Sequence, residues 1–292
     1  MTLSTMTNNL NRYVPGINPD LLQSYIQDSY RILCAIEWNA LKVTKSIYTT
    51  APYSTGTVSI DAAGTVTGVA TVWTAAMVGM YMRVHYGNSL FTIATVTPPT
   101  TLTLSDWTGD VVAAGETYSI LRTIYAIPSD YKLVWDVTYQ TALTKKSQTY
   151  FNEIDPDRSS SGQPLWWSYA GQSSTGTLQI ELYPVPDAVY PIKLYGKKKV
   201  SALALTDSPI LPEDLVEAHA LTQLYRLKIQ QQPQAGWEAL LQQHIELVYN
   251  PIFTAFKEED AEYDAHEDHV KDRFGQPDYP PSDTFRSSHD VD

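Results

Sequence analysis

Two glycines, Gly171 and Gly176, flank the segment that comes closest to a phosphate-binding loop, and Thr177 follows them. A Walker A loop needs a lysine directly after the second glycine, because the ammonium group reaches the β- and γ-phosphates. Thr177 occupies that position, and the residues after it lack the pattern of a helix. We therefore interpret residues 171–176 as a turn between two strands.

Acidic residues near position 155 are candidates for a calcium loop or a catalytic carboxylate pair. Asp155 and Asp157 resemble the start of an EF-hand loop, but glycine and glutamate are required where Ser160 and Trp166 stand. Glu153 and Asp157 could form a carboxylate pair, yet a serine-rich loop holds two side chains poorly at a fixed short separation. We interpret residues 155–164 as a solvated loop.

Two histidines three residues apart, His266 and His269, lie beside Glu267 and Asp268 and could share one helix face around a divalent ion. The sequence supplies no obvious further ligand, and ordering so charged a segment would be costly. A solvated segment is therefore predicted there, and no metal site.

The remaining reactive side chains have structural interpretations. His219 and His244 lie on or beside apolar helical stripes, which predicts interior histidines with hydrogen-bond partners, and the single cysteine, Cys34, lies in an apolar helical pattern. The basic run 197–199 is predicted to be a solvated strand edge. No nucleophile motif such as Gly-x-Ser-x-Gly occurs. We predict that the protein is not an enzyme and uses no cofactor.

The net charge is −12, and most of it lies near the C-terminal end. From Glu258 onward there are twelve Asp and Glu against three Lys and Arg, which leaves −3 for the preceding residues. An acidic chain argues against tight nonspecific binding of duplex DNA, which depends on Lys and Arg. No signal-peptide core and no apolar run of about 18 residues are found, which predicts a soluble protein made in a cytoplasm.

Helical patterns occupy both ends of the chain. Asn-Pro-Asp at 18–20 is a helix start, and apolar residues then recur at spacings of three and four, so we expect a helix that ends near Leu41. Further helices are expected over residues 211–232 and 237–263, with Pro251 breaking or kinking the second of these.

Two β regions lie between the helical segments. Residues 56–121 contain short β-branched runs that Gly, Pro and Asn separate, which predicts a small all-β module with a hairpin at Gly87-Asn88. Its expected strands are 56–60, 65–68, 81–86, 91–96, 101–104 and 118–121. The second region has expected strands at 132–139, 165–169 and 178–183, and residues 190–195 are expected to return as a hairpin after the turn at 183–187.

From Asp264 the chain loses apolar periodicity and is rich in Asp, His, Pro and Ser. It has too little apolar surface to fold alone, but it contains three spaced aromatic residues, Phe274, Tyr279 and Phe285. We predict that this tail orders on a partner and that these three residues are its docking residues.

Three local patterns together resemble a known family. Residues 56–120 read Gly-Thr-Val…Val-Thr-Gly…Phe-Thr-Ile…Thr-Leu-Thr-Leu…Tyr-Ser-Ile, which is similar to a small β-domain of tailed-bacteriophage virion proteins. Residues 125–131, Tyr-Ala-Ile-Pro-Ser-Asp-Tyr, resemble the Leu-Pro-Ser-Asp-Phe step of phage head–tail adaptor (connector) proteins. Residues 182–187 and 209–213 resemble the second half of the adaptor sequence, so the resemblance extends over about residues 19–256.

The resemblance implies an α+β fold. It implies a helical bundle built from N- and C-terminal segments, with inserted β-barrel- or β-sandwich-like domains and an extended acidic C-terminal arm. The N-terminal helical part would be residues 1–50, the inserted β-domain 51–122 and the second β region 123–204. A C-terminal helical part, residues 205–263, would pack with the first part, and the arm would be residues 264–292.

The resemblance also implies a function. The protein would be a structural virion component at the head–tail junction, in a homo-oligomeric ring of about twelve copies. Its partners would be the portal protein, a tail or nozzle protein and the genomic DNA, which would pass through the channel without specific binding. No membrane partner is expected.

Two alternatives come from other classes. A β-rich glycan-binding module of a tail spike or fibre would use Trp73, Trp166 and Trp167 to stack on sugars. The two helical blocks argue against it, since a fibre module would not need them. A cell-wall hydrolase built on Glu153 and Asp157 ranks last.

Overall fold

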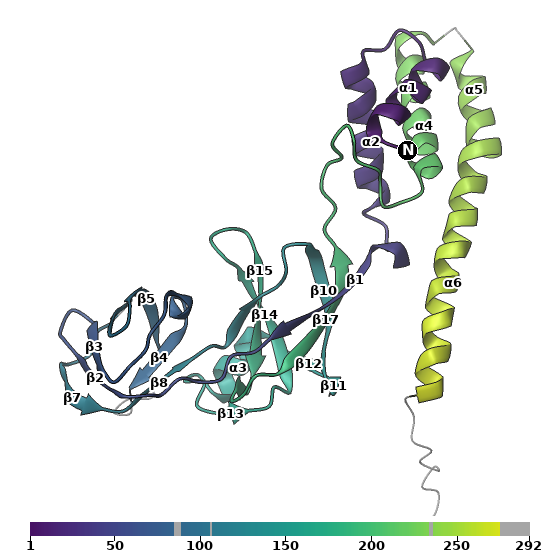
Figure 1. Ribbon diagram of the computed structural model, residues 1–292. Coiled ribbons are helices and arrows are strands. Elements are labelled where there is room, and N and C mark those ends of the chain that lie inside the picture. The colour runs from purple at the N-terminus through teal and green to yellow at the C-terminus, as the bar shows by residue number, and fades with distance from the viewer. Residues whose placement is uncertain (85–88, 106, 234–235, 275–292) are drawn as a thin grey trace, which may run out of the picture. The chain divides into compact units, whose positions relative to one another are not determined.

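The computed structural model describes residues 1–84, 89–105, 107–233 and 236–274, with side chains described up to residue 262. The fold is mixed α and β, as predicted. The chain divides into two compact units: a helical unit, Met1–Leu41 with Val200–Asp292, and a β unit, Lys42–Lys199. Figure 1 shows their elements.

The helical unit has one apolar core to which both ends of the chain contribute. Helix α2 packs on α1 and α4, and α4 packs on α5. Leu22 and Ile26 of α2 join Leu215 and Leu224 of α4 in that core, and all four are fully buried. The elements are α1 (Leu3–Tyr13), α2 (Pro19–Leu33), η1 (Asn39–Leu41), α4 (Glu213–Gln231), α5 (Trp237–His244), η3 (Ile245–Tyr249) and α6 (Asn250–Phe274).

Helix α1 was not expected from the sequence. Thr2 is its N-cap and accepts a hydrogen bond from the backbone N–H of Thr5 at 3.3 Å. Leu3, Met6 and Leu10 recur at spacings of three and four and are buried. This spacing is the signal of an amphipathic helix, which was available in the sequence.

The predicted end of the helix near Leu41 is wrong, because α2 ends at Leu33. The indole N–H of Trp38 donates to the Leu33 carbonyl oxygen at 2.8 Å, which satisfies one of the terminal carbonyl groups. The following residues form β1 (Lys42–Tyr48), which pairs with β17 (Pro191–Lys198). β-Branched residues in this stretch favour the strand.

Pro251 neither breaks nor ends the C-terminal helix. α5, the π-helical turn η3 and α6 follow one another without interruption (Figure 1). Since Pro251 has no N–H, the carbonyl group of Leu247 lacks its usual α-helical donor, and the wide turn lies at this point. Helix α6 continues to Phe274, so the extended arm does not begin at residue 264 as predicted.

The first part of the β unit is a seven-stranded sheet of order β7-β2-β3-β6-β5-β4-β8, in which all neighbours are antiparallel. Its expected strands are confirmed, that of residues 81–86 as far as Val84 because the next residues lie outside the description, and β7 is an addition. The hairpin predicted at Gly87-Asn88 lies outside the described residues. The bounds are β2 (Thr57–Ile60), β3 (Thr65–Val69), η2 (Ala75–Met77), β4 (Tyr81–Val84), β5 (Phe91–Thr97), β6 (Thr101–Leu104), β7 (Val112–Glu116) and β8 (Tyr118–Leu121).

The second part contains two four-stranded sheets, β1-β17-β10-β11 and β12-β14-β15-β9, which share one apolar core, and a short β13–β16 pair. The turn predicted at 171–176 is confirmed, because it joins β14 to its antiparallel partner β15. The remaining elements are β9 (Ile124–Ala126), β10 (Tyr131–Tyr139), β11 (Thr141–Ala142), β12 (Thr144–Lys145), α3 (Gln148–Ile154), β13 (Ser161–Gly162), β14 (Trp166–Gln172), β15 (Leu178–Tyr183) and β16 (Val185–Pro186).

Two predictions for this part are wrong. Residues 190–195 do not return on β15, because β17 pairs with β1 and β10 and β15 pairs with β14 and β9. Pro184 and Pro186 lack backbone donors, and the chain leaves the β15 sheet there. Residues 197–199 do not form a solvated edge: β17 lies between two strands, and Lys197 is buried.

Candidate functional site

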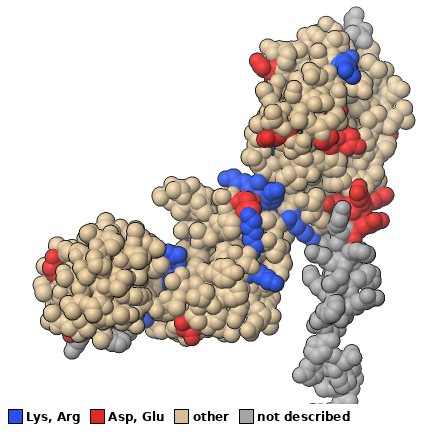
Figure 2. All heavy atoms as spheres, viewed as in Figure 1, with Lys and Arg blue, Asp and Glu red and all other residues tan. Residues whose placement is uncertain are grey.

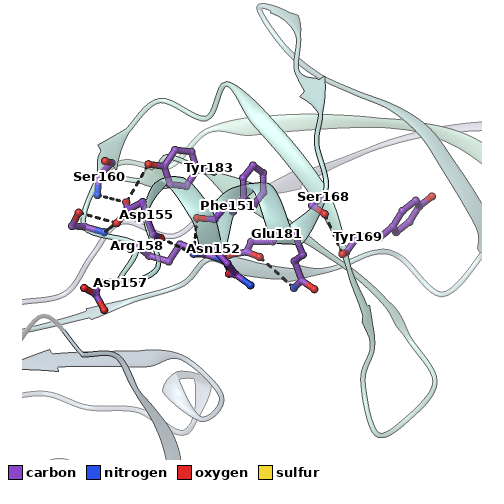
Figure 3. Close-up of polar contacts among 12 residues, drawn as sticks. Phe151, Asn152, Asp155, Asp157, Arg158, Ser160, Ser168, Tyr169, Glu181 and Tyr183 are labelled. Atoms are coloured by element: carbon purple, nitrogen blue, oxygen red, sulfur yellow. Dashed lines mark hydrogen bonds and ion pairs between the residues drawn. The ribbon is translucent and has the colours of Figure 1, made fainter.

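The β unit contains a buried polar cluster around Arg158, which lies just after α3. The Arg158 Nε donates to Glu181 Oε1 of β15 at 2.6 Å, and both side chains are less than one tenth exposed. The guanidinium group also donates to the carbonyl oxygen of Asp155 at 2.6 Å and to Asn152 Oδ1 at 2.6 Å. Figure 3 shows the side chains of Asn152, Arg158 and Glu181 close to one another. Glu181 therefore has the counter-charge that a buried carboxylate requires.

Asp155 organises the loop that carries Arg158. Its carboxylate accepts hydrogen bonds from the backbone N–H of Ser159 and Ser160, both at 2.8 Å, and from the Tyr183 hydroxyl at 3.1 Å (Figure 3). Burial by itself would raise the pKa of Asp155, but the donated hydrogen bonds outweigh it and lower the pKa to about 2. Residues 155–164 form a loop, as predicted, which contains the short strand β13, but the loop is not solvated throughout, because Asp155 and Arg158 are buried.

The cluster connects the seven-stranded sheet to the second part of the β unit. Arg83 of β4 donates through Nη2 to the carbonyl oxygens of Asp157 and of Arg158, the latter at 2.7 Å. The pKa of Tyr81, on the same strand, is raised by burial and then by the negative charge of Glu181. Two side chains of β4 thus interact with the cluster.

The arrangement does not resemble a catalytic centre. Arg158 and Asp155 are both engaged by protein groups, and Arg158 has an unusual positive φ of 50°. Of the proposed carboxylate pair, Glu153 is exposed and Asp157 is half-buried. The described residues contain no group of three or more His, Cys, Asp or Glu side chains that could hold a metal ion. The geometry instead suits the fixing of one part of the chain against another.

Two of the three tryptophans proposed for glycan binding are in the core. Trp73 is 1% exposed and donates to the Tyr118 hydroxyl at 3.0 Å, and Trp167 is fully buried. Trp166 stacks on Tyr183 with a ring separation of 5.6 Å and an angle of 4°. The aromatic platform that a sugar site requires is not formed by these residues.

The helical unit has polar contacts that tie the two ends of the chain together. Asp260 of α6 accepts hydrogen bonds from the backbone N–H of Asn39 at 2.7 Å and of Ala40 at 2.9 Å. His244 contacts the Ala218 carbonyl oxygen at 2.9 Å, as expected for an interior histidine with a partner. His219 differs, because its buried Nδ1 has no partner among the described residues, and burial lowers its pKa.

The residues predicted to dock a partner are not tested by these contacts. Phe274 is the last residue of α6, and its side chain lies outside the description, as do those of His266 and His269. Tyr279 and Phe285 lie outside the described residues. Among the helices of the described part, none combines the length and apolar character needed to cross a bilayer.

An exposed surface that was not predicted from the sequence lies on the β1–β17–β10 sheet. Tyr48, Leu133 and Trp135 are 66%, 43% and 43% exposed, and Lys132 and Lys193 are exposed close to them in the sheet. In Figure 2 most of the visible Lys and Arg lie on the β unit, whereas Asp and Glu lie on both units. Along residues 131–137 every third residue is buried, because bulges interrupt β10, so a search for strand alternation in the sequence could not reveal this face.

Comparison with known proteins supports the resemblance noted in the sequence. The sequence model of the SU10 adaptor protein family matches residues 101–254, which begin inside the seven-stranded sheet and end in α6. A search of curated proteins finds no match. The matched segment includes the Arg158 cluster and both sheets of the second part. It covers more than half of the chain, and the chain belongs to the SU10 adaptor protein family, a family of structural phage proteins.

Proposed function

We propose that the protein is a subunit of a head–tail adaptor ring, which joins the portal to the tail and surrounds the path of the DNA. The observation that carries the proposal is the family match over residues 101–254, which supports a structural role in the virion. Adaptor rings must hold neighbouring subunits in a fixed geometry. The Arg158 cluster contributes a rigid subunit, because its buried pair with Glu181 and its directional hydrogen bonds fix parts of one chain against each other.

The charge distribution agrees with a role beside DNA that does not bind it. The helical unit contains 21 Asp and Glu against eight Lys and Arg, whereas the β unit contains 11 against 12. An acidic wall repels phosphates, so DNA passes it without being held. We propose that the helical unit supplies acidic surface to the channel.

The C-terminal tail is the proposed docking segment toward a neighbouring virion protein, with Phe274, Tyr279 and Phe285 as anchors. A segment with little apolar surface becomes ordered when it binds a partner, and this ordering costs conformational entropy. Its deletion should begin after Phe274, since Asp260 holds the N–H groups of Asn39 and Ala40 and α6 continues to Phe274.

The proposal is tested by the number of copies per particle. Quantitative mass spectrometry of purified particles, with the major capsid protein as reference, should give about twelve copies, the number that the family resemblance implies for the closed ring. Particles made without the protein should carry no tails, and a supplied copy should restore them. A copy number of three or six that follows the fibres, or absence from the particle, would contradict the proposal.

A further inference from the structure

The β1–β17–β10 sheet has one face in the core and one open face. On the inner face, Val43 and Ile47 of β1, Ile192 and Leu194 of β17 and Val134 of β10 belong to the shared apolar core. Side chains alternate along β1 and β17, so Tyr48 and Lys193 lie on the opposite face. In β10 the register shifts between Tyr131 and Leu133 and between Val134 and Asp136, and these bulges leave Lys132, Leu133 and Trp135 exposed between buried residues. We call the exposed set Tyr48, Lys132, Leu133, Trp135 and Lys193 the open sheet face.

The register of the strands places these residues along the length of β17, with Tyr48 opposite Pro191 at one end. Lys193 is opposite Ser46 of β1 and Thr138 of β10, and Leu133 is opposite Lys197. Val134 is buried between Leu133 and Trp135, which are both exposed. A tryptophan, a leucine and a tyrosine exposed on one sheet face form the kind of surface that a partner covers.

The charge on this face is not neutralised locally. Lys132 and Lys193 have no ion-pair partner among the described residues. Of the nearby acids, Asp130 pairs with Lys45 at 2.7 Å. Asp136 accepts a hydrogen bond from the N–H of Val137 at 2.8 Å and forms no ion pair with these lysines. A partner that brings both carboxylates and apolar side chains would complement the face.

Residues 275–292 of this chain have that chemistry. They contain four aspartates and one arginine, together with the aromatic residues Tyr279 and Phe285. Duplex DNA would also attract the lysines, but phosphates have no apolar group to cover Leu133 and Trp135. The mixture of charge and aromatic rings therefore favours the tail.

The spacing of the aromatic residues agrees with this choice. Tyr48 is opposite Pro191 and Leu133 is opposite Lys197, so the two positions are separated by six residues along β17. At about 3.3 Å per residue this separation is about 20 Å. Tyr279 and Phe285 are also six residues apart, so an extended segment would span the same length.

We propose that the open sheet face of one copy binds residues 275–292 of a second copy. This inference rests on the proposed function, because a contact between two different surfaces of identical chains is the kind that closes into a ring. It names the surface that receives the tail, which the family match does not.

The test is carbodiimide coupling of carboxylates to amines in the full-length protein, with mass spectrometry of the linked peptides. An equal mixture of ¹⁴N- and ¹⁵N-labelled protein distinguishes links within one chain from links between copies. We expect mixed-isotope links from Asp278 or Asp283 to Lys132 or Lys193, and we expect the yield to fall as salt is added. Links confined to one chain, or spread evenly over exposed lysines, would overturn the inference.

A synthetic peptide of residues 275–292 keeps the test decisive where the protein does not assemble in solution. Added to the full-length protein, it should couple to Lys132 and Lys193. A peptide with Tyr279→Ala and Phe285→Ala keeps the charge and should couple about tenfold less, the loss expected for about 1.4 kcal/mol of apolar contact. Equal coupling of the two peptides, or preferential displacement of the native peptide by duplex DNA, would contradict the proposal.

Lysine variants distinguish binding of the tail from the cross-linking reaction. Lys132→Arg with Lys193→Arg retains the charge and removes the reactive amines, so hydrogen exchange should still report protection of the tail although the links disappear. Lys132→Glu with Lys193→Glu should abolish both. If the charge-reversed protein still enters particles at the normal copy number and its tail remains protected, this inference fails while the proposed ring stands.

Discussion

The two units of the molecule bury charge in different ways. In the helical unit the core is made of apolar side chains from both ends of the chain, and the Arg31–Asp28 pair lies on the surface with its side chains 79% and 58% exposed. In the β unit the Arg158–Glu181 pair is buried, with side-chain exposures of 9% and 5%. In the helical unit distant segments are joined by apolar contact and by the hydrogen bonds of the Asp260 carboxylate, whereas the β unit also has a buried ion pair between them.

This difference shows how precisely each kind of contact fixes the position of one segment relative to another. Apolar burial is strong but has no preferred direction, so it tolerates small shifts of one helix on another. Hydrogen bonds weaken steeply as their angles change, so the bonds of Arg83 to the carbonyl groups of Asp157 and Arg158 limit how the seven-stranded sheet lies within the β unit. We therefore expect the β unit to be sensitive to the loss of single polar groups.

The largest effect is expected from Arg158→Met. It leaves Glu181 buried without its counter-charge and removes donors from the carbonyl groups of Phe151 and Asp155. Loss of one partner of a buried pair costs about 3–5 kcal/mol. Hydrogen exchange followed by mass spectrometry reports the two units separately, so the loss should appear in the β unit.

The exposed pair provides the control for that variant. Arg31→Met should cost less than about 1 kcal/mol, since surface ion pairs contribute little. Replacing both buried partners, Arg158→Met with Glu181→Met, should recover much of the loss. A cost below about 1 kcal/mol for Arg158→Met alone would contradict the importance of the cluster.

A core truncation in the helical unit should have the next largest effect. Leu215→Ala removes a fully buried side chain of α4 and should cost about 3 kcal/mol, with the exchange change confined to the helical unit. Leu240→Ala, at a residue that is 44% exposed on α5, is the matched control and should cost well under 1 kcal/mol. Similar costs for the two variants would be inconsistent with the packing described.

Gly196→Ala tests the close approach of two strands in the β unit. A Cβ atom there would overlap the carbonyl oxygen of Leu133, so β10 and β17 would have to separate. We expect a loss of about 2–3 kcal/mol in denaturant unfolding. In Gly162→Ala the added Cβ has nothing within 4 Å, so the denaturant concentration at the midpoint of unfolding should be nearly unchanged. A tolerated Gly196→Ala would mean that the register is wrong.

The smallest effect is a pH dependence that arises from Asp155. Its pKa is about 2 in the folded protein and near 3.9 in an unfolded chain, so the stabilisation is complete above about pH 5 and is lost as the pH falls toward 2. The loss should be about 2 kcal/mol. Unfolding of the wild type and of Asp155→Asn, compared between pH 6 and pH 2, isolates this contribution. Identical pH profiles for the two proteins would show that Asp155 is not stabilised as an anion.

Apolar periodicity predicted most of the elements, because the same residues form the cores. The stripe beginning at Leu22 and the alternating runs of the seven-stranded sheet both correspond to buried faces. Charged residues were interpreted less well. Arg158 lies in a polar, serine-rich stretch, and its burial depends on Glu181 in a strand more than twenty residues away.

The same limit explains the error at Lys197. A run of three lysines has the composition of a solvated edge, but its strand lies between β1 and β10, and strand order depends on pairings that are distant in the sequence. The hairpin expected at 190–195 failed for the same reason. Local patterns indicate which residues form a strand, whereas its partners depend on the packing of the whole unit.

The central claim is the adaptor ring, and the most direct test is a cryo-electron microscopy reconstruction of the particle neck without imposed symmetry. The account predicts about twelve copies of this chain in a closed ring around the DNA, between portal and tail. Density for the chain in threefold fibres, or a neck that lacks it, would contradict the account.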